Sequence, residues 1–491
     1  MLRDSQGLDV TTDSPETIAA INRYTDQALA YGKDALVILK AIEADPTCAI
    51  ANAHAAALYL SHECAESRRK AAPYLQTAKK HKDKTTEREK LFISAVEAWA
   101  TGAIDKLIAY AETITTKYPH DLLAVQLGQY HYFYQGDKEK LLQIAEKVLL
   151  ANHENHYLYG MVAFGLEQCH RLGEAEAMGR RATQINRNDP WAHHAVAHVM
   201  ETQGRIEEGI AWMESLSDTW DNCNSMLYTH NWWHIALYYL EQLDIQKVLE
   251  LYDTHVWGHA WKESPKDQIG AIQVLLRLEL RGLDVGNRWE NLVPYLRARI
   301  HEHALPFQDL HYIYALARAD QNELVDEMLL SMQEYTKTAK PYIRRTWTEV
   351  VVPAAKGMVA HARGDWATAS IELGSTLSCL YAIGGSHAQR DLFEQVYLDA
   401  WLRAEQNHQA LHLLQKRFAA RRYIPSIQGG LSPSTVASRL AIQKHSSFKR
   451  NGTDLIIDKP LRRGSGGGAG FPTRASVRKG FGGKPPKPGF S

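Results

Sequence analysis

The sequence predicts an all-α fold, a solenoid of paired helices, and three observations support this prediction. Short residues that suit helix N-caps stand at Asp121, Asn155 and Asp189, 34 residues apart each time (155 − 121 and 189 − 155). Each precedes an apolar-periodic helix, and a turn such as Gln135–Asp137 or Gln203–Arg205 separates it from a second amphipathic helix. No convincing run of strand residues occurs along the chain. Two helices per 34 residues are the tetratricopeptide pattern.

The other elements follow from the same periodicity, taken in chain order. Upstream, a helix over Ala35–Glu43 is expected to end at Asp45-Pro46, and Cys48–Leu60 is expected to resume with small residues. The second helices of the three clear repeats are expected over Leu141–Leu150, Ala175–Gln184 and Ile206–Met213. Further helices are expected over Asp267–Arg281, Arg288–His301, Gln308–Arg318, Glu323–Tyr335, Trp347–Ala362, Trp366–Ile383 and Ala388–Glu405.

The length of 491 residues exceeds what one compact core usually holds, which favours a repeat array. We expect a flexible N-terminus over residues 1–14, one tetratricopeptide-like array over residues 15–440, and a linker with a disordered basic tail over residues 441–491. From Leu461 the chain is mostly Gly, Pro, Arg, Lys and Ser, which bury too little apolar surface to order a segment. A tether for RNA or an anionic surface is one function for this tail, and a dispensable end is the favoured alternative.

Charge and cysteine usage indicate a partner class and a compartment. The eight basic residues after Asp458 leave 48 basic against 56 acidic residues in 1–458, a net charge of −8, so no specific nucleic-acid partner is expected. No apolar run is long enough for a membrane span, and the first residues lack a secretory signal. The five cysteines are scattered without a C-x-x-C pair, which indicates a cytoplasmic protein with reduced thiols.

Two histidine pairs are the most unusual chemical feature of the sequence. His194 and His198 are four residues apart, as are His230 and His234, so each pair shares one face of a helix. The second pair follows the first by 36 residues (230 − 194), close to one repeat. Because first helices of successive repeats line the concave side of a solenoid, we expect the four imidazoles to face a common space.

Other polar and aromatic residues are expected to complete a groove around these histidines. Arg277 and Arg390 suit a carboxylate or phosphate, and Trp191, Trp232 and Trp233 suit amphipathic walls. Asp253 is either a cap or a group that orients His230 or His234. The residues predicted to bind a ligand are His194, His198, Glu201, His230, Asn231, Trp233, His234, Arg277, Asp309, His311, Gln389, Arg390 and Asp391.

Three functions remain open for this groove. The first is binding of a small molecule or peptide. The second is an enzyme with acid–base or metal-dependent chemistry, with catalytic candidates His198, His230, His234, Asp253 and His311. A divalent metal is the cofactor that the pattern allows, and its candidate ligands are His194, His198, His230 and His234. The third is a protein-interaction scaffold in which the histidines are structural.

Several other chemistries are poorly supported. The second pair lacks the glutamate of H-E-x-x-H, so a metalloprotease is not indicated. Neither a phosphate loop of the G-x-x-x-x-G-K-[ST] type nor a G-x-S-x-G elbow occurs. Cys223 near His230 is only a weak candidate for a thiol nucleophile.

Several motifs together resemble the tetratricopeptide repeat protein 38 family. The similarity runs over residues 15–440, and the motifs occur in the family's order. His387 departs from the family pattern, which weakens its claim to an essential role, and the basic tail has no counterpart there. The resemblance implies a helical-repeat fold without implying a reaction. The motifs are Trp191–Glu201, His230–Tyr238, Leu251–His255, Leu276–Leu280, Gly286–Trp289, Phe307–His311 and Gly384–Phe393.

Overall fold

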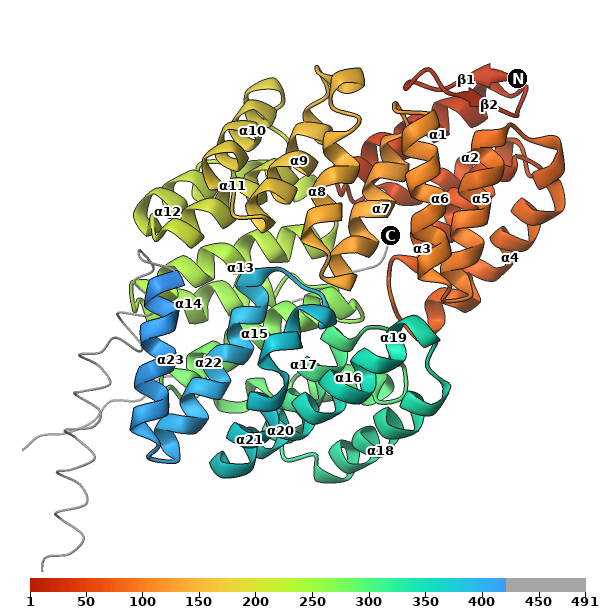
Figure 1. Ribbon diagram of the computed structural model, residues 1–491. Coiled ribbons are helices and arrows are strands. Elements are labelled where there is room, and N and C mark those ends of the chain that lie inside the picture. Colours follow the sequence, from red (N-terminus) through yellow and green to blue (C-terminus); the bar gives the residue numbers. More distant parts are fainter. Residues whose placement is uncertain (421–491) are drawn as a thin grey trace, which may run out of the picture. The chain divides into compact units, whose positions relative to one another are not determined.

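Paired helices make up nearly all of the computed structural model, which describes residues 1–420, with side chains to residue 415 (Figure 1). The prediction of an all-α solenoid of tetratricopeptide-like helix pairs is confirmed for this part of the chain. The predicted tail over residues 441–491 and the predicted boundary at residue 440 lie outside the described residues. Among the helices that are described, none is both long and apolar enough to span a membrane.

The N-terminal segment, for which the sequence predicts a flexible end, contains two short paired strands. Strands β1 (Leu2–Arg3) and β2 (Asp9–Val10) pair antiparallel, and the Val10 side chain is fully buried. The backbone N–H and the hydroxyl of Thr11 both donate to the Glu89 carboxylate, at 3.0 and 2.6 Å. Burial of one apolar side chain and these long-range hydrogen bonds hold the segment against the helices.

The first helices carry the N-cap chemistry that their sequences provide. Ser14 accepts from the backbone N–H of Thr17, and Thr86 forms a reciprocal capping box with Glu89. The predicted helix over Ala35–Glu43 is observed as a 3₁₀ turn that leads into an α-helix. The elements are α1 (Pro15–Leu29), η1 (Ala35–Val37), α2 (Ile38–Ala44), α3 (Ala49–Leu60), α4 (Ala65–His81), η2 (Lys82–Lys84), α5 (Glu87–Ala100) and α6 (Ile104–Lys117).

The three central repeats form as the spacing of their caps predicts. The side chains of Asp121, Asn155 and Asp189 each accept a hydrogen bond from the third backbone N–H that follows, at 3.0 to 3.3 Å. Gly136 and Gly204 end their helices with a left-handed backbone, at φ of 70° and 71°. The elements are α7 (Leu122–Gln135), α8 (Lys138–Glu146), η3 (Leu150–Asn152), α9 (His156–Gln168), α10 (Leu172–Ile185), α11 (Pro190–Gln203) and α12 (Ile206–Glu214).

The following helices carry α13 and α15, which border the site described below. The elements are η4 (Ser217–Asn222), α13 (Ser225–Glu241), α14 (Ile245–Leu251), η5 (Tyr252–Val256), α15 (Pro265–Leu280), η6 (Gly286–Arg288), α16 (Val293–Leu296), η7 (Arg297–Arg299), α17 (Pro306–Arg318) and α18 (Asn322–Thr338). The predicted helix over Arg288–His301 is wrong in its length, because the chain is broken there into short turns around α16. Pro294 has no backbone N–H and sits in the first turn of α16, where a helix tolerates proline.

The last described helices return to the repeat pattern. Trp347–Ala362 is continuous, with a π-helical first turn, and the predicted helix over Trp366–Ile383 is α-helical only to Thr376 before it tightens into a 3₁₀ helix. The elements are α19 (Pro341–Thr346), η8 (Trp347–Val351), α20 (Val352–Ala362), α21 (Trp366–Thr376), η9 (Leu377–Ile383), α22 (His387–Arg403) and α23 (Asn407–Ala420).

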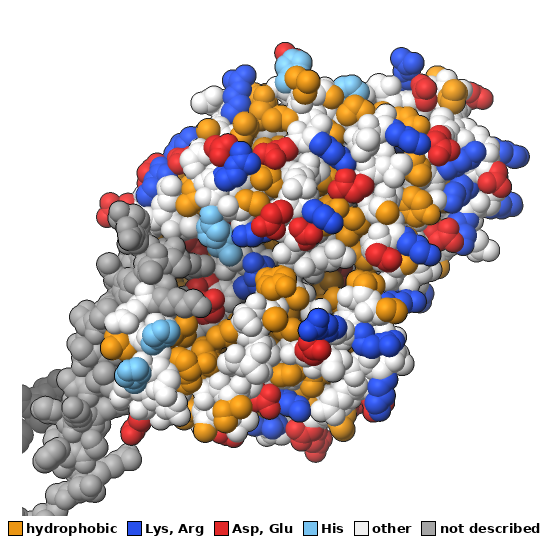
Figure 2. Space-filling model, in the orientation of Figure 1, with side chains coloured by type: hydrophobic (Ala, Val, Ile, Leu, Met, Phe, Trp, Pro, Cys, Tyr) orange, Lys and Arg blue, Asp and Glu red, His pale blue; other side chains and the backbone are white. Residues whose placement is uncertain are grey.

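Contacts between segments far apart in sequence enclose an interior space. The Lys266 ammonium on α15 donates to the Ser61 carbonyl after α3 at 3.1 Å. The backbone N–H of Ala65 donates to the Glu302 carboxylate at 3.0 Å, and His387 on α22 contacts Glu167 on α9. Helices from the first and last parts of residues 1–420 therefore line one interior. On the outer face in Figure 2, basic and acidic side chains alternate without a large region of one sign.

Candidate functional site

The four histidines of α11 and α13 meet in the interior. His194 Nε2 lies 3.0 Å from His198 Nε2 and 3.1 Å from His230 Nε2. The ring centroids of His198 and His234 are 4.5 Å apart. One ring nitrogen from each of the four lies within 4.8 Å of the others. The sequence-based prediction that the imidazoles face a common space therefore holds geometrically, and their role in binding stays a prediction.

Two carboxylates and a fifth histidine stand around this histidine cluster. Glu201 Oε2 lies 3.2 Å from His234 Nδ1, and Glu167 Oε2 lies 3.7 Å from His198 Nδ1. His387 Nε2 forms a short contact with the other oxygen of Glu167. Sequence analysis did not single out Glu167. Its signal was present, because Glu167 and Glu201 are 34 residues apart (201 − 167) and so occupy matching positions of two repeats.

Burial decides the protonation states in the cluster. Burial lowers the pKa of His198 to about 3, with Glu167 opposing and His234 adding to the effect. Burial also lowers the pKa values of His194 and His230 well below their ordinary range, and the neighbouring imidazoles lower them further. Burial alone would raise the pKa of Glu167, but His387 and His198 hold it at about 2. At neutral pH His194, His198 and His230 are therefore uncharged imidazoles, and Glu167 beside them is an ionised carboxylate.

Several buried nitrogens of the cluster have no hydrogen-bond partner among the described residues. They are Nδ1 of His194, Nδ1 of His198 and Nε2 of His234. A buried polar atom without a partner costs about 1–3 kcal/mol, so three of them close together require a compensating interaction. Trp233 Nε1 and Asn231 Oδ1 beside them are also without partners.

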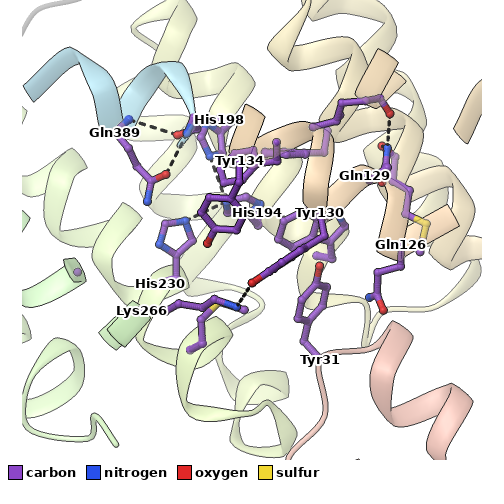
Figure 3. Close-up of a pocket in the computed structure, with 18 of the residues that line it drawn as sticks. Tyr31, Gln126, Gln129, Tyr130, Tyr134, His194, His198, His230, Lys266 and Gln389 are labelled. Carbon is purple, nitrogen blue, oxygen red and sulfur yellow. Dashed lines mark hydrogen bonds between the residues drawn. The ribbon is translucent and has the colours of Figure 1, made fainter. Parts of the chain in front are cut away.

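The cluster forms one wall of an internal cavity of about 130 Å³ (Figure 3). His194, His198 and His230 line it on one side. Aromatic and amide side chains from α7 and α9 line it as well, together with Lys266 and Ile269 from α15. A larger cavity of about 820 Å³ adjoins it. The two share part of their lining, namely Tyr31, Gln126, Tyr130, Met226 and Lys266.

Lys266 and Tyr130, which line both cavities, belong to a second polar group. The Lys266 ammonium is 3.3 Å from the Tyr130 hydroxyl, which in turn makes a short hydrogen bond to Glu63. Burial lowers the pKa of Lys266, and the carboxylates of Glu63 and Asp267 oppose this. The sequence does not predict this group, because its members come from three distant parts of the chain and follow no local pattern.

Some of the other residues predicted for the groove lie next to the cluster. The Trp233 ring stacks on His230 with an interplanar angle of 10°, and the Arg277 guanidinium lies 5.4 Å from the Trp233 ring centroid. Gln389 lines the smaller cavity. The Asn231 amide is 3.4 Å from the Pro190 carbonyl, at the start of the helix that carries His194 and His198.

Further predicted residues are buried in structural contacts behind the cavity wall. His311 lies 3.0 Å from the Gln273 amide and 2.6 Å from the Phe307 carbonyl, so only Phe307 of this group reaches the cavity. The Arg277 guanidinium donates to the Ala388 carbonyl at 3.0 Å. Gln395 donates to Asp391 at 2.7 Å, and Asp391 opposes the lowering of the Arg277 pKa that burial causes.

Three of the predicted roles require correction, and Cys223 remains the weak candidate that the sequence indicates. Asp253 does not orient His230 or His234, because its side chain is 49% exposed and pairs with Arg288 at 2.6 Å. Asp309 does not face the cavity, because it is buried against His303 at 2.5 Å. The Arg390 guanidinium donates to the carbonyls of the loop before its own helix. Burial raises the pKa of Cys223 to about 12, which makes it a poor thiolate nucleophile.

No family model matches the chain. Among solved structures, the chain is similar to the human IFIT1 dimer with m7Gppp-AAAA, at 14% identity over 85% of this chain and 98% of that chain, with a TM-score of 0.38. It is also similar to the human IFIT1 dimer with PPP-AAAA, at 16% identity over 90% and 98% with a TM-score of 0.37. An IFIT1 monomeric mutant with Gppp-AAAA matches at 14% identity over 91% and 98%, with a TM-score of 0.37.

These neighbours correct one sequence-based expectation. The chain was expected to have no specific nucleic-acid partner, but each neighbour is described with an AAAA ligand that carries a phosphate-linked group. That expectation is therefore withdrawn.

Proposed function

We propose that this protein binds a small anionic, aromatic molecule in the two adjoining cavities. The observation that carries this proposal is the lining of the larger cavity, which among the described residues contains Lys33, Lys70 and Lys266 and no Asp or Glu. Residues 1–458 have a net charge of −8, so a cavity wall with only basic charges is an exception within this chain. Such a wall favours a negatively charged ligand.

The three lysines differ in how far they are already paired. Lys70 lies 3.5 Å from Glu66, and Lys33 donates to the Asp221 carbonyl at 3.0 Å. Lys266 donates to one backbone carbonyl and lies 3.3 Å from the Tyr130 hydroxyl, and it makes no direct ion pair among the described residues. Lys266 also lines both cavities, so it is the group best placed to bind the ligand's charge.

Aromatic rings supply the rest of the recognition. Tyr59 and Tyr74 stack with centroids 5.6 Å apart, and Trp261 meets His62 edge-on at 5.2 Å. All four rings line the larger cavity, and Trp261 is 47% exposed although its ring is large and apolar. Rings of this kind favour a flat ligand, which they contact face-on or edge-on. The volume of about 820 Å³ falls in the range of small-molecule sites.

The proposal is tested by calorimetry with 2-naphthoate and its neutral counterpart 2-naphthamide, alongside AMP and a short oligoadenylate. We expect the carboxylate to bind at least about tenfold more tightly than the amide, a difference of about 1.4 kcal/mol. Lys266→Met should remove this preference. The matched control is Lys262→Met, since Lys262 lies 3.9 Å from the Trp257 ring centroid and lines neither cavity.

Equal affinity for the acid and the amide, or an unchanged preference in Lys266→Met, would contradict the proposal. If only the oligoadenylate binds, the ligand is a nucleic acid and not a small aromatic anion. Binding of peptides alone would support the peptide-binding alternative.

An enzyme that uses the same cavities is the second candidate, because His194, His198 and His230 form the wall of the smaller cavity and would contact a ligand there. A scaffold with purely structural histidines is the third.

The order of the motifs from Trp191 to Phe393 supports a finer proposal, that the chain is related to the tetratricopeptide repeat protein 38 family. The repeat array is proposed to span residues 15–440. A cytoplasmic location is proposed from the five cysteines, which are all free thiols.

A further inference from the structure

We propose that His194, His198, His230 and His234 form a binding site for one divalent metal ion of the zinc class. This inference goes beyond the proposed ligand binding and does not depend on it. It rests on the spacing of the ring nitrogens, on their unsatisfied hydrogen-bonding capacity, and on the two carboxylates behind them.

The spacing of the nitrogens matches that of ligands around a single ion. In a tetrahedral site with Zn–N bonds of about 2.0–2.1 Å, neighbouring ligand nitrogens are about 3.3 Å apart. The two Nε2–Nε2 distances from His194 are 3.0 and 3.1 Å, and the set of four nitrogens lies within 4.8 Å. Only small side-chain rotations separate this arrangement from a coordination shell.

The protein alone cannot satisfy these nitrogens. An uncharged imidazole has one N–H donor and one lone pair. His194 Nε2 faces two other Nε2 atoms and can make one good hydrogen bond, so one neighbour is left out. Its Nδ1 and that of His198 are buried and have no hydrogen-bond partner in the part of the chain that the structure describes. A metal ion accepts all the Nε2 lone pairs at once, and the ring protons then move to the Nδ1 atoms.

The carboxylates are placed to support such a shell. Metal-bound histidines usually donate their second N–H to a carboxylate or carbonyl. His234 Nδ1 already lies 3.2 Å from Glu201, and His198 Nδ1 lies 3.7 Å from Glu167. Two ionised carboxylates balance the charge of a divalent ion in a buried site. Arg277 contributes positive charge near Glu201, and the Asp391 carboxylate in turn contributes negative charge near Arg277.

A neighbouring set of groups is a weaker metal site. Glu167, His198 and His387 also converge within 4.8 Å. However, Glu167 is already hydrogen-bonded to His387 and to the Gln168 amide, so these atoms have protein partners without a metal. His198 belongs to both sets, and the four-histidine set is preferred because the Nε2 atoms of His194, His198 and His230 face one another with no carboxylate as their partner.

The experiment is a titration of the chelator-treated full chain with Zn²⁺ in competition with a chromophoric chelator, repeated with Co²⁺ to observe its visible absorption. We expect one equivalent to bind and the Co²⁺ spectrum to show tetrahedral nitrogen coordination. His198→Ala and His234→Ala should each weaken binding at least about 100-fold, and Glu201→Gln about 10- to 100-fold.

The matched control is His193→Ala, because His193 is also buried on α11 but pairs with the Trp220 indole at 3.2 Å. Its affinity for Zn²⁺ should be unchanged. Circular dichroism of the metal-free variants checks that they fold, and Glu201→Gln keeps the test decisive if an alanine variant does not. Failure to bind Zn²⁺ and Co²⁺, or binding that all cluster variants retain, would overturn the proposal and leave the naphthoate result unaffected.

Discussion

Two groups of buried histidines in this molecule differ in how their ring nitrogens are hydrogen-bonded. His303 and His361, which lie in the C-terminal half, each contact a buried carboxylate, Asp309 at 2.5 Å and Asp399 at 3.0 Å. The histidine cluster on α11 and α13 instead turns its ring nitrogens toward one another and leaves several of them without partners. A histidine with a dedicated partner stabilises the fold. A set of histidines that lacks partners is arranged for something that binds.

The largest effect is expected where a dedicated pair is broken. Asp309→Ala leaves Nδ1 of buried His303 without its partner and leaves a cavity where the carboxylate was, which together cost about 3 kcal/mol. Urea denaturation should show a drop of this size in the free energy of unfolding. The affinity for Zn²⁺ of the folded fraction should not change. A loss below about 1 kcal/mol would show that the pair of His303 and Asp309 does not stabilise the fold as proposed.

The next largest effect is expected from metal-dependent stability. Zn²⁺ at 100 times its dissociation constant should stabilise the wild type by about 2.7 kcal/mol, because it binds only the folded state. His198→Ala should abolish this gain, whereas Asp309→Ala should retain it on a lower baseline. Thermal unfolding with and without Zn²⁺ measures both. A gain that persists in His198→Ala would place the bound metal outside the cluster.

A third kind of buried histidine makes stability depend on pH. Burial, with a contribution from Lys266, lowers the pKa of His131 from 6.5 to about 3. Below pH 6.5 the unfolded chain binds a proton at this residue and the folded chain does not. Stability is therefore complete above pH 6.5 and declines as the pH falls toward 3, by about 1.4 kcal/mol per pH unit.

Replacement of His131 tests whether this residue causes the pH dependence of stability. Below pH 6.5, the free energy of unfolding of His131→Phe should fall less steeply than that of the wild type, by about 1.4 kcal/mol per pH unit. Trp99→Phe is the control, because Trp99 packs edge-on against His131 at 4.7 Å and does not titrate. An equal slope in wild type and His131→Phe would assign the pH dependence to other groups.

The smallest effect is expected at Asp253. Its pair with Arg288 is exposed, and such pairs contribute about 0–1 kcal/mol. Asp253→Asn should therefore change the free energy of unfolding by less than about 1 kcal/mol and leave Zn²⁺ and naphthoate binding unchanged. A marked loss of affinity for Zn²⁺ or naphthoate in this variant would show that Asp253 contributes to the site.

Local rules made the fold and the centre of the site predictable. The N-caps at Asp121, Asn155 and Asp189 depend on side chains that bond to amides three residues away, and these can be read from the sequence. The convergence of the histidine pairs follows from helical spacing combined with the repeat length. Rules of this kind extend over about one repeat.

Features that depend on longer-range packing were not predictable. The group formed by Glu63, Tyr130 and Lys266 joins three distant helices or turns, and no local pattern connects its members. Asp309 carries the residue type expected in a polar groove, but His303 faces it only in the folded chain. The spacing of residues in the sequence therefore predicts where the histidines meet. Which residues line the cavity and which form structural pairs follows only from the folded structure.

The most direct measurement is anomalous diffraction at the zinc edge from crystals of the full chain grown with one equivalent of Zn²⁺. The account predicts one dominant peak among the α11 and α13 imidazoles, about 2.0–2.1 Å from at least three of their Nε2 atoms. Zinc found only at surface residues, with the cluster free of anomalous density, would contradict it.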